Sequence, residues 1–329
     1  MNKIATSDQK KTKILDGIPM LIVAIVLVVV LVVLGFVGSN NLRRTLIRIF
    51  LYCAMASMWN LMSGYTGMTS LGQQTFIGVA GYTMAVFTAK LALPFGLGLL
   101  AGGVIGGVLA LILSIILFRM RGMYFAIATW VIAEALKTFF RSWEFVNMGG
   151  GMTVKSSIRP NSAGIYIMAL VLMVVAIVLI YILLRSKLGL GLTAMRDDAD
   201  AASSVGVNIF NSKLICFVIC GIFCALAGGL YYLNYVSIYP NSGFAIDWTV
   251  SLVFIVIIGG VGTMSGPIVG TIVYIILDEL LKKLPTGWPN IVLGAIAILV
   301  IVFLPDGIMG TLQKKFRFEI LSEKRFSGE

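Results

Sequence analysis

The sequence predicts an all-α integral membrane protein with about ten transmembrane helices, some of them short or broken. Of its 329 residues, 59% are hydrophobic and 12% are charged, and its mean hydropathy is +1.00. Soluble domains carry about 25% charged residues, so a surface built from this chain would be too apolar for water. The first long apolar run, residues 20–36, has no charged or polar side chain. A helix needs about 20 apolar residues to cross the hydrocarbon core, and residues 18–37 meet that length.

The number of spans follows from the later apolar stretches. The region 250–304 is interrupted by glycines at 259–262 and prolines at 285–289, and we interpret it as three passes. The other stretches lie at about 45–63, 71–90, 92–118, 122–140, 164–184 and 213–233. The predicted total is therefore about ten, within a range of eight to ten. We expect an N-terminal tail at 1–17, a transmembrane domain at 18–310 and a C-terminal tail at 311–329.

Two regions have weaker signals for a full crossing. The stretch 71–90 opens with Gln73 and Gln74, and the passes near 250–283 are short. Polar or irregular backbone is tolerated at membrane depth where it is buried in protein or lines a cavity. We therefore expect broken or re-entrant helices in these two regions.

Basic residues predict the orientation, because short cytoplasmic loops carry excess lysine and arginine. With ten passes, four basic clusters fall on one side, which puts both termini and the 185–212 loop in the cytoplasm. The clusters are Lys3, Lys10, Lys11 and Lys13; Arg119 and Arg121; Arg185, Lys187, Arg196 and Lys213; and Lys314, Lys315, Arg317, Lys324 and Arg325. Two groups do not fit and would face outward: Arg43, Arg44 and Arg48, and the pair Lys282 and Lys283. The first group could snorkel from a helix end.

Composition also bears on what the chain can bind. It has no histidine, which removes the commonest general base and metal ligand. Cys216, Cys220 and Cys224 share one face of an apolar helix, and we interpret them as small residues that pack against a neighbouring helix rather than as a metal site. The net charge of +11 is spread over tails and helix ends instead of forming one patch. We therefore expect a lipid bilayer as partner, and neither a bound metal nor nucleic acid.

Glycine spacing predicts close helix packing. Gly102 and Gly106, and Gly103 and Gly107, form overlapping G-x-x-x-G pairs, which let two backbones approach closely in a membrane. Glycine-rich breaks at 64–67 and 259–262 lie in opposite halves of the chain. Such breaks in corresponding places indicate a site in a transporter, although ordinary turns and packing also use glycine.

The longest hydrophilic stretch between apolar segments, 185–212, has the pattern of a locally folded element. Asp197, Asp198 and Asp200 suit a helix N-terminus, where carboxylates oppose the dipole and accept from free N–H groups. An alanine-rich turn follows, and Gly206 is a plausible C-terminal stop. A compact helix at this place could dock a soluble partner, and the alternative is a solvated connecting loop.

Residues 194–207, AMRDDADAASSVGV, resemble the coupling segment of branched-chain amino-acid ABC-transporter permeases of the M type. Further blocks are similar to the family and keep its order, so that the resemblance covers about residues 45–310. They are GYTGMTSLGQ at 64–73, RGMYFAIAT at 121–129, ALAGGLY at 225–231, GGVGTMSGP at 259–267 and LPDGI at 304–308. Relatives with the same pattern move urea, nucleosides or aromatic acids, so the blocks specify the family better than the solute.

The resemblance implies a type II ABC-importer-like permease subunit in the cell (plasma or inner) membrane. Such subunits work with a second homologous permease, two ABC ATPases and an extracytoplasmic solute-binding protein. The chain lacks the G-x-x-x-x-G-K-[ST] phosphate loop, so we expect ATP and Mg on the partner ATPases, no cofactor on this chain, and no enzymatic activity of its own. The residues expected to engage the ATPase are Arg196, Asp197, Asp198, Ala201, Ala202 and Gly206.

Candidates for the translocation path are residues where polar groups or bare backbone meet the bundle interior. They are Ser70, Gln73, Gln74, Thr129, Gly259, Gly260, Gly262 and Glu134. Glu134 is the one acid well inside a span, and an ionisable residue at depth indicates function. Lys137 and Arg141 follow at i+3 and i+7, so a structural ion pair near the outer interface is an equal alternative. A stand-alone channel or secondary transporter is the competing class, and a membrane enzyme has the least support.

Overall fold

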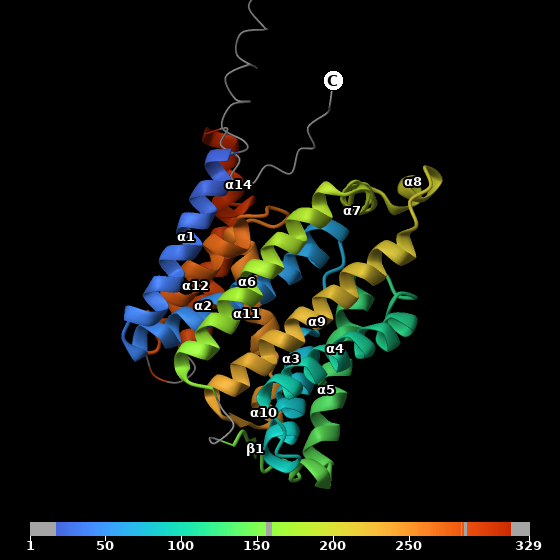
Figure 1. The fold of residues 1–329 in the computed structure, drawn as a ribbon. Coiled ribbons are helices and arrows are strands. Elements are labelled where there is room, and N and C mark those ends of the chain that lie inside the picture. Colours follow the sequence, from blue (N-terminus) through green and yellow to red (C-terminus); the bar gives the residue numbers. More distant parts are fainter. Residues whose placement is uncertain (1–17, 156–159, 284, 286–287, 317–329) are drawn as a thin grey trace, which may run out of the picture.

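The computed structural model describes residues 18–155, 160–283, 285 and 288–316, and this part of the chain is a helical bundle (Figure 1). Its first half contains α1 (Ile18–Val37), α2 (Asn40–Asn60), α3 (Gln73–Ala85), α4 (Phe95–Leu117), α5 (Met123–Ser142) and α6 (Ser162–Arg185). Its second half contains α7 (Lys187–Asp197), α8 (Ala199–Ser204), α9 (Ile209–Tyr235), α10 (Pro240–Gly243), α11 (Asp247–Gly259), α12 (Gly266–Leu281), α13 (Trp288–Phe303) and α14 (Gly307–Phe316).

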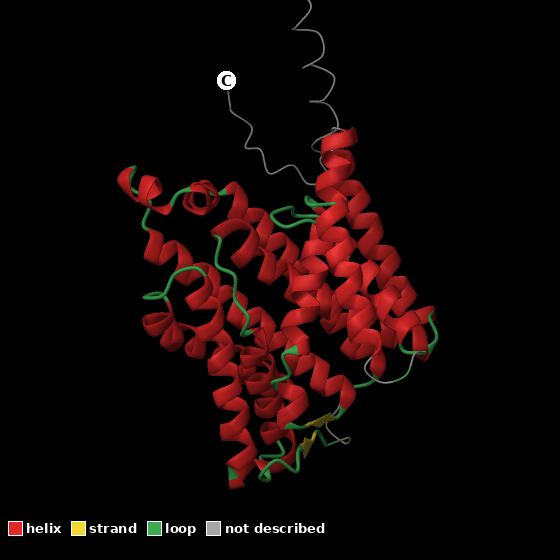
Figure 2. Cartoon of the chain, turned by 180° about the vertical axis from the view of Figure 1, so that it is seen from behind, coloured by secondary structure: helices red, strands yellow, loops and turns green. Residues whose placement is uncertain are grey.

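Shorter elements extend or connect these helices. α2 and α3 each continue into a turn of π-helix, η1 (Leu61–Tyr65) and η2 (Val86–Lys90). A 3-10 turn, η3 (Glu144–Val146), follows α5. Two short strands, β1 (Met152–Thr153) and β2 (Ser237–Ile238), pair antiparallel at one end of the bundle (Figure 2).

The all-α membrane fold predicted from the sequence is confirmed. Each of the ten predicted apolar segments corresponds to a helix, and seven stretches in the described part are long and apolar enough to cross a membrane. The seven are Asn40–Tyr65, Phe95–Leu117, Met123–Ser142, Ser162–Arg185, Ile209–Tyr235, Pro240–Gly259 and Ile291–Gln313. α3 and α12 are shorter, as expected for the stretches that begin with Gln73 and Gln74 or follow the glycine break.

Glycine brings the helices of the bundle into close contact, as the G-x-x-x-G pairs predict. A Cβ added at Gly106 would lie 2.5 Å from the Cβ of Ala225 on α9, and one at Gly107 would meet Ile222 of the same helix. Gly102 faces Ala80 of α3 instead. One surface of α4 therefore packs on both α3 and α9 through bare backbone.

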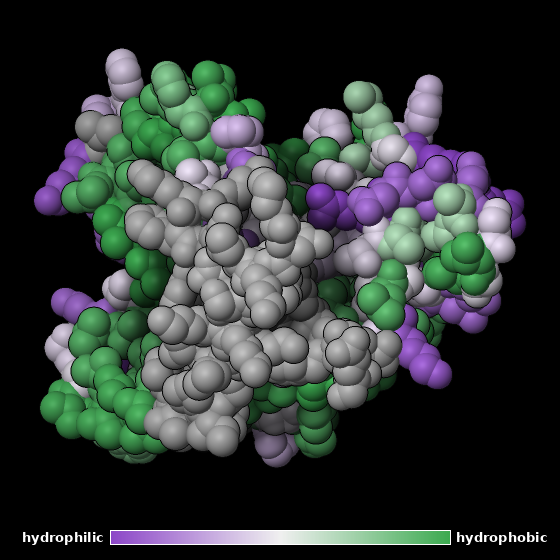
Figure 3. Space-filling view, turned by 90° about the horizontal axis from the view of Figure 1, so that it is seen from above, coloured by the Kyte–Doolittle hydropathy of each residue, from purple (hydrophilic) through white to green (hydrophobic). Residues whose placement is uncertain are grey.

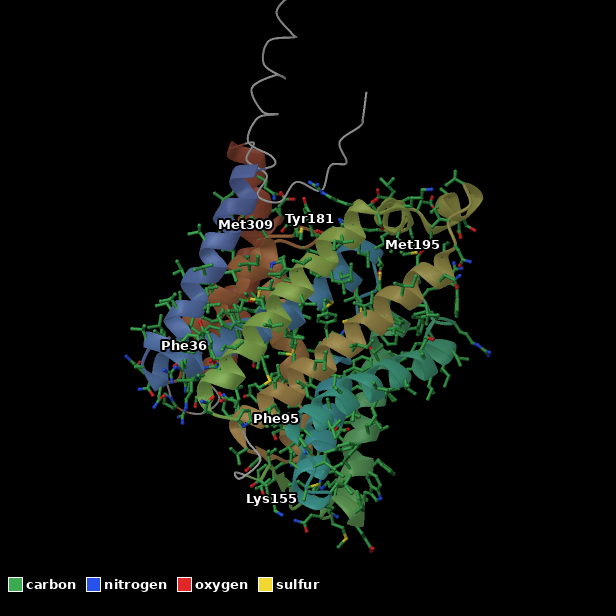
Figure 4. The ribbon with its side chains drawn as sticks, viewed as in Figure 1. Phe36, Phe95, Lys155, Tyr181, Met195 and Met309 are labelled. Atoms are coloured by element: carbon green, nitrogen blue, oxygen red, sulfur yellow. The ribbon has the colours of Figure 1, made fainter. Side chains whose placement is uncertain are left out.

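The ends of the bundle differ in what they carry. α7, α8 and the end of α14 lie at one end, whereas the strands and α10 lie at the other (Figure 1). The labelled Met195 of α7 and Met309 of α14 are at the first end, and Lys155 is at the opposite end (Figure 4). Hydrophilic residues gather over α7 and α8 when the molecule is seen from above (Figure 3). We call these the α7 end and the strand end.

Candidate coupling and transport site

The 185–212 stretch folds into two short helices. α7 ends at Asp197, and the Asp198 side chain caps α8 by accepting hydrogen bonds from the backbone N of Asp200 (2.9 Å) and of Ala201 (3.0 Å). Gly206 has φ +90°, and its N donates to the carbonyl of Ser203 at 3.0 Å. Asp198 and Asp200 therefore start a helix and Gly206 follows its end, as predicted, whereas Asp197, predicted at the same helix start, is the last residue of α7. The sequence did not predict that Arg196 and Asp197 would end one helix and that Asp198 would cap the next.

The two faces of α8 have different surroundings. Ala202 is buried, with 3% of its surface exposed, and Val207 packs on Gly191 of α7. Ala201 is exposed, and Val205 is 79% exposed beyond the last turn of α8. Of the predicted coupling residues, Ala202 thus faces the bundle, while Ala201 and its neighbour Val205 form a small apolar surface that points outward.

Arg196 is exposed and reaches from α7 to the end of the bundle. Its Nη1 donates a hydrogen bond of 2.7 Å to the carbonyl oxygen of Gly64, at the π-helical end of α2. A Cβ added at Gly262 would lie 2.7 Å from the same nitrogen. One guanidinium from the predicted coupling segment therefore touches both glycine-rich breaks, from opposite halves of the sequence.

Asn60 connects the two breaks directly. Its Nδ2 donates to the carbonyl of Thr263, and its Oδ1 accepts from the N of Gly262, both at 2.9 Å. A Cβ at Gly64 would lie 2.3 Å from Asn60 Oδ1 and 2.6 Å from Gly262 N, so glycine is required for this approach. We call Asn60, Gly64, Arg196, Gly262 and Thr263 the coupling junction.

The start of α14 packs against the same place. A Cβ at Gly307 would lie 2.5 Å from the Cα of Gly260, and both glycines have positive φ angles, +70° and +123°. Four of the blocks that carry the family resemblance therefore meet at the α7 end of the bundle: 64–73, 194–207, 259–267 and 304–308.

Sequence reasoning did not single out Asn60. Its signal was available, because it is an amide in the largely apolar stretch 49–62, four residues before Gly64. A buried amide needs hydrogen-bond partners, and the nearest backbone without a regular helical partner is a glycine break. The sequence near Asn60 does not predict that its partner is Gly262, which lies 202 residues later in the chain.

The predicted path residues Ser70, Gln73, Gln74 and Thr129 lie inside the chain, each at most 4% exposed. Thr129 Oγ1 accepts from Leu71 N at 3.0 Å, and Gln74 Nε2 donates to the carbonyl of Leu71 at 3.1 Å. Their bonds hold the segment between α2 and α3 against α5 and α11.

The same cluster extends to α9 and α11. Thr249 accepts from Gln73 N at 3.2 Å and donates to Gln74 Oε1. Cys220 Sγ lies 3.6 Å from Gln73 Oε1. Ser70 and Thr129 also line a small cavity with Thr75, whose buried hydroxyl has no hydrogen-bond partner. In this conformation these polar groups join helices together.

The remaining candidates fall at two other places. Gly259 lies where α11 meets α12, since a Cβ there would be 2.0 Å from the carbonyl of Gly266. Glu134 is on the outer face of α5, where its carboxylate pairs with Lys137 Nζ at 2.9 Å. The three α9 cysteines are buried and free. Among the described residues no group of histidine, cysteine or acidic side chains could hold a metal ion.

At the strand end, one cation from each of the two basic groups that did not fit the charge rule binds the same acidic pair. Arg48 of α2 is ion-paired with Asp278 and, at 2.6 Å, with Glu279 of α12. Lys282 pairs with the same two carboxylates at 3.1 and 2.8 Å. Arg43 donates to the carbonyl oxygens of Gly35 and Phe36 at the end of α1. Arg43, Arg48 and Lys282 are thus matched by local acceptors, which lowers the cost of placing these three cations on the predicted outer side.

The fold and these contacts define a multi-pass helical membrane protein. Its short helix α7 is linked through Arg196 to the glycine-rich breaks at 64–67 and 259–262. A family model described as "Branched-chain amino acid transport system / permease component" matches residues 41–301. The chain belongs to this family. It is a permease subunit of an ABC importer and not an enzyme, and ATP hydrolysis lies in separate subunits.

Curated relatives agree with this assignment. The chain is similar to the high-affinity branched-chain amino acid permease LivM of Salmonella typhimurium, with 23% identity over 86% of this chain and 73% of the relative. It is also similar to a probable LivM of Methanocaldococcus jannaschii, with 25% identity over 79% and 90%. An L-arabinose ABC permease, AraH of Azospirillum brasilense, is 23% identical over 88% and 86%. No solved structure matches this chain.

Proposed function

We propose that this permease subunit imports branched-chain or related amino acids, and that it forms the translocation path with a second homologous permease. Two ABC ATPases that hold ATP and Mg would dock at the α7 end in the cytoplasm, and an extracytoplasmic solute-binding protein would deliver the solute at the strand end. Relatives named for branched-chain amino acids support this solute class. The arabinose relative supports the alternative, another small polar solute on the same type of permease.

One observation carries the proposed docking role of α8. The exposed Ala201 and Val205 lie next to a helix, α7, whose Arg196 is hydrogen-bonded to the bundle at Gly64. A displacement of α7 by an ATPase therefore acts directly on the ends of α2 and α11. Rigid-body shifts of this kind are a recurrent way to transmit a conformational change.

The docking role is tested by placing a charge on the exposed surface. Val205→Glu should lower ATPase co-purification and solute-stimulated uptake, because a carboxylate resists burial in an apolar groove. Tyr239→Glu is the control for ATPase co-purification, since Tyr239 is also an exposed large side chain, 50% exposed, but lies at the opposite, strand end. The proposal is contradicted if Val205→Glu retains the ATPase and transports as the parent chain does.

The orientation is tested by labelling single introduced cysteines in intact cells. Lys155→Cys at the strand end should react with a membrane-impermeant thiol reagent, and Ala201→Cys on α8 should react only after the membrane is opened. Both positions are exposed, and the four native cysteines are buried, so their background should be low. Labelling of the α8 cysteine in intact cells would reverse the proposed orientation.

A further inference from the structure

The outer face of α5 is an exposed stripe that carries a charged pair. Tyr124, Ile127 and Val131 follow one another at intervals of three and four residues, and all three are exposed. Glu134 continues the stripe one turn later and pairs with Lys137. The carboxylate side chain keeps 51% of its surface exposed. The stripe is therefore apolar toward one end of the helix and ionic at its centre.

Glu134 lies near the middle of its span. α5 has 20 residues, which at about 1.5 Å per residue matches a hydrocarbon core of about 30 Å. Glu134 is the twelfth residue, so it lies roughly 2 Å from the midpoint of the helix. Arg121 precedes the helix and Trp143 follows it, and such residues are typical of the two membrane interfaces. The ion pair of the alternative interpretation is present as Glu134–Lys137, but it begins near the middle of α5 and not at its outer end.

Contact between this charged face and lipid is energetically unfavourable. Ionised side chains within membrane helices are rare, and they face the protein interior or a water-filled cavity. In the described part of this chain, Glu134 faces no interior, because it is on the outer surface of the bundle. α4 gives the contrast: its exposed stripe, with Val108, Ile112 and Ile115, is apolar throughout. The polar surroundings that Glu134 requires must therefore lie outside this chain.

We propose that the outer face of α5 lines the translocation path and that Glu134 and Lys137 bind the charged groups of a passing amino acid. This inference rests on the proposed function and identifies the wall of the path that this chain contributes. The solute ammonium group would pair with Glu134 and its carboxylate with Lys137, which matches the two opposite charges of a zwitterion. Val131 and Ile127, one and two turns away, provide apolar contact for a hydrophobic side chain.

The first experiment tests whether water reaches the outer face of α5 in the assembled transporter. Val131→Cys should react with a small cationic thiol reagent in the complete complex, and transported amino acid should slow the reaction. Ile112→Cys, equally exposed on α4, is the matched control and should remain unreactive in lipid. If the two cysteines react at the same slow rate, α5 faces lipid or a dry contact and the inference is overturned.

The second experiment separates recognition from a structural ion pair. In proteoliposomes with the complete transporter, Glu134→Gln should reduce amino-acid uptake about tenfold through lost charge pairing, while ATPase co-purification stays at the parent level. The double variant Glu134→Lys with Lys137→Glu restores the pair but reverses its direction. A structural pair predicts full rescue of uptake, which would overturn the inference, whereas recognition predicts that uptake stays low.

The parent transporter keeps the two proposals apart. If the unmodified complex takes up no amino acid, the proposed function fails, whatever the variants do. If it takes up amino acids and Glu134→Gln does so equally well, the proposed function stands and the role of Glu134 fails.

Discussion

Two arginines show that different interactions join the two ends of this permease. They contact opposite halves of one helical rod, which is formed by α2 and its π-helical continuation η1. Arg48 near the start of α2 is paired with Asp278 and Glu279, which also bind Lys282. Arg196 reaches the other end of the same rod, where it donates to the neutral carbonyl of Gly64. The strand end is thus joined by a network of full charges, and the α7 end by one charge-assisted hydrogen bond, the two neutral hydrogen bonds of Asn60 and bare backbone contacts.

The difference indicates which end can move. Hydrogen bonds to charged groups contribute about 1.5–3 kcal/mol each, so a docked partner can offset one such bond by its own binding energy. A network of four charges that joins α2 to α12 is harder to separate, because removing one member leaves the others unpaired. We therefore expect α2 to be fixed at the strand end and to respond to α7 at its π-helical end, where helix irregularities frequently mark functional sites.

The largest effect should come from filling the backbone contact at the coupling junction. Gly64→Ala puts a Cβ 2.3 Å from Asn60 Oδ1 and 2.6 Å from Gly262 N, so the two breaks must separate. Overpacking costs typically 1–3 kcal/mol, and we expect about 3 kcal/mol here because backbone cannot move aside easily. Uptake should be abolished, and the thermal midpoint of the purified chain should fall. Gly96→Ala, where a Cβ meets nothing within 4 Å, is the control.

Breaking the charge network at the strand end should come next. Removal of one partner from a buried pair costs about 3–5 kcal/mol. Arg48→Met should cost less, about 2 kcal/mol, because the Asp278 side chain is 20% exposed and Lys282 remains bound to it. The comparison predicts a lower thermal midpoint together with normal coupling of ATP hydrolysis to uptake. Lost coupling at unchanged stability would assign Arg48 to the moving end and remove the distinction between the two ends.

Arg196 should give the reverse result. Arg196→Gln shortens the side chain and removes its charge, so the bond to Gly64 is lost at a cost of about 1.5 kcal/mol. Expression should persist, while ATP hydrolysis by the assembled transporter should no longer drive uptake. Asp197→Asn is the matched control, since this neighbour is exposed at the end of α7 and its substitution leaves the Arg196 bond in place. Equal losses of coupling in the two variants would point to docking contacts instead of the coupling junction.

The helices of this fold were predictable because membrane thickness sets the length of an apolar run, although their ends differ by a few residues: α2 was predicted at 45–63 and spans Asn40–Asn60. The start and stop of α8 were predictable too, since Asp198 and Gly206 act on backbone within a few residues of themselves. The destination of Arg196 was not, because Gly64 lies 132 residues earlier and nothing local specifies it. From sequence, Arg196 was expected to lie outside the helix core, and it is exposed; its contact with the two glycine-rich breaks was not expected.

The path candidates show a second limit of sequence reasoning. Gln73 and Gln74 were selected because a polar side chain at membrane depth costs free energy unless it has hydrogen-bond partners or a function. Burial and hydrogen bonding to Thr249 meet that requirement within the chain. Glu134 was selected by the same rule, yet it remains on the surface. The sequence shows which side chains are polar, but not where their helices pack. α3 lies inside the bundle, so Gln73 and Gln74 are buried, whereas α5 lies at its edge, so Glu134 is exposed.

The smallest expected effect concerns the cap of α8, and it tests whether docking depends on a preformed helix. Asp198→Ala removes the acceptor for the N–H groups of Asp200 and Ala201, and loss of such a cap costs about 1 kcal/mol. α8 has only six residues, so the effect should stay local: the thermal midpoint should hold while ATPase affinity falls several-fold. Asp198→Asn preserves an accepting oxygen and should restore affinity, because asparagine caps as well as aspartate. If Asn fails where Asp succeeds, the charge of Asp198 rather than its cap is what the ATPase recognises, and the α7 end would then depend on charge as the strand end does.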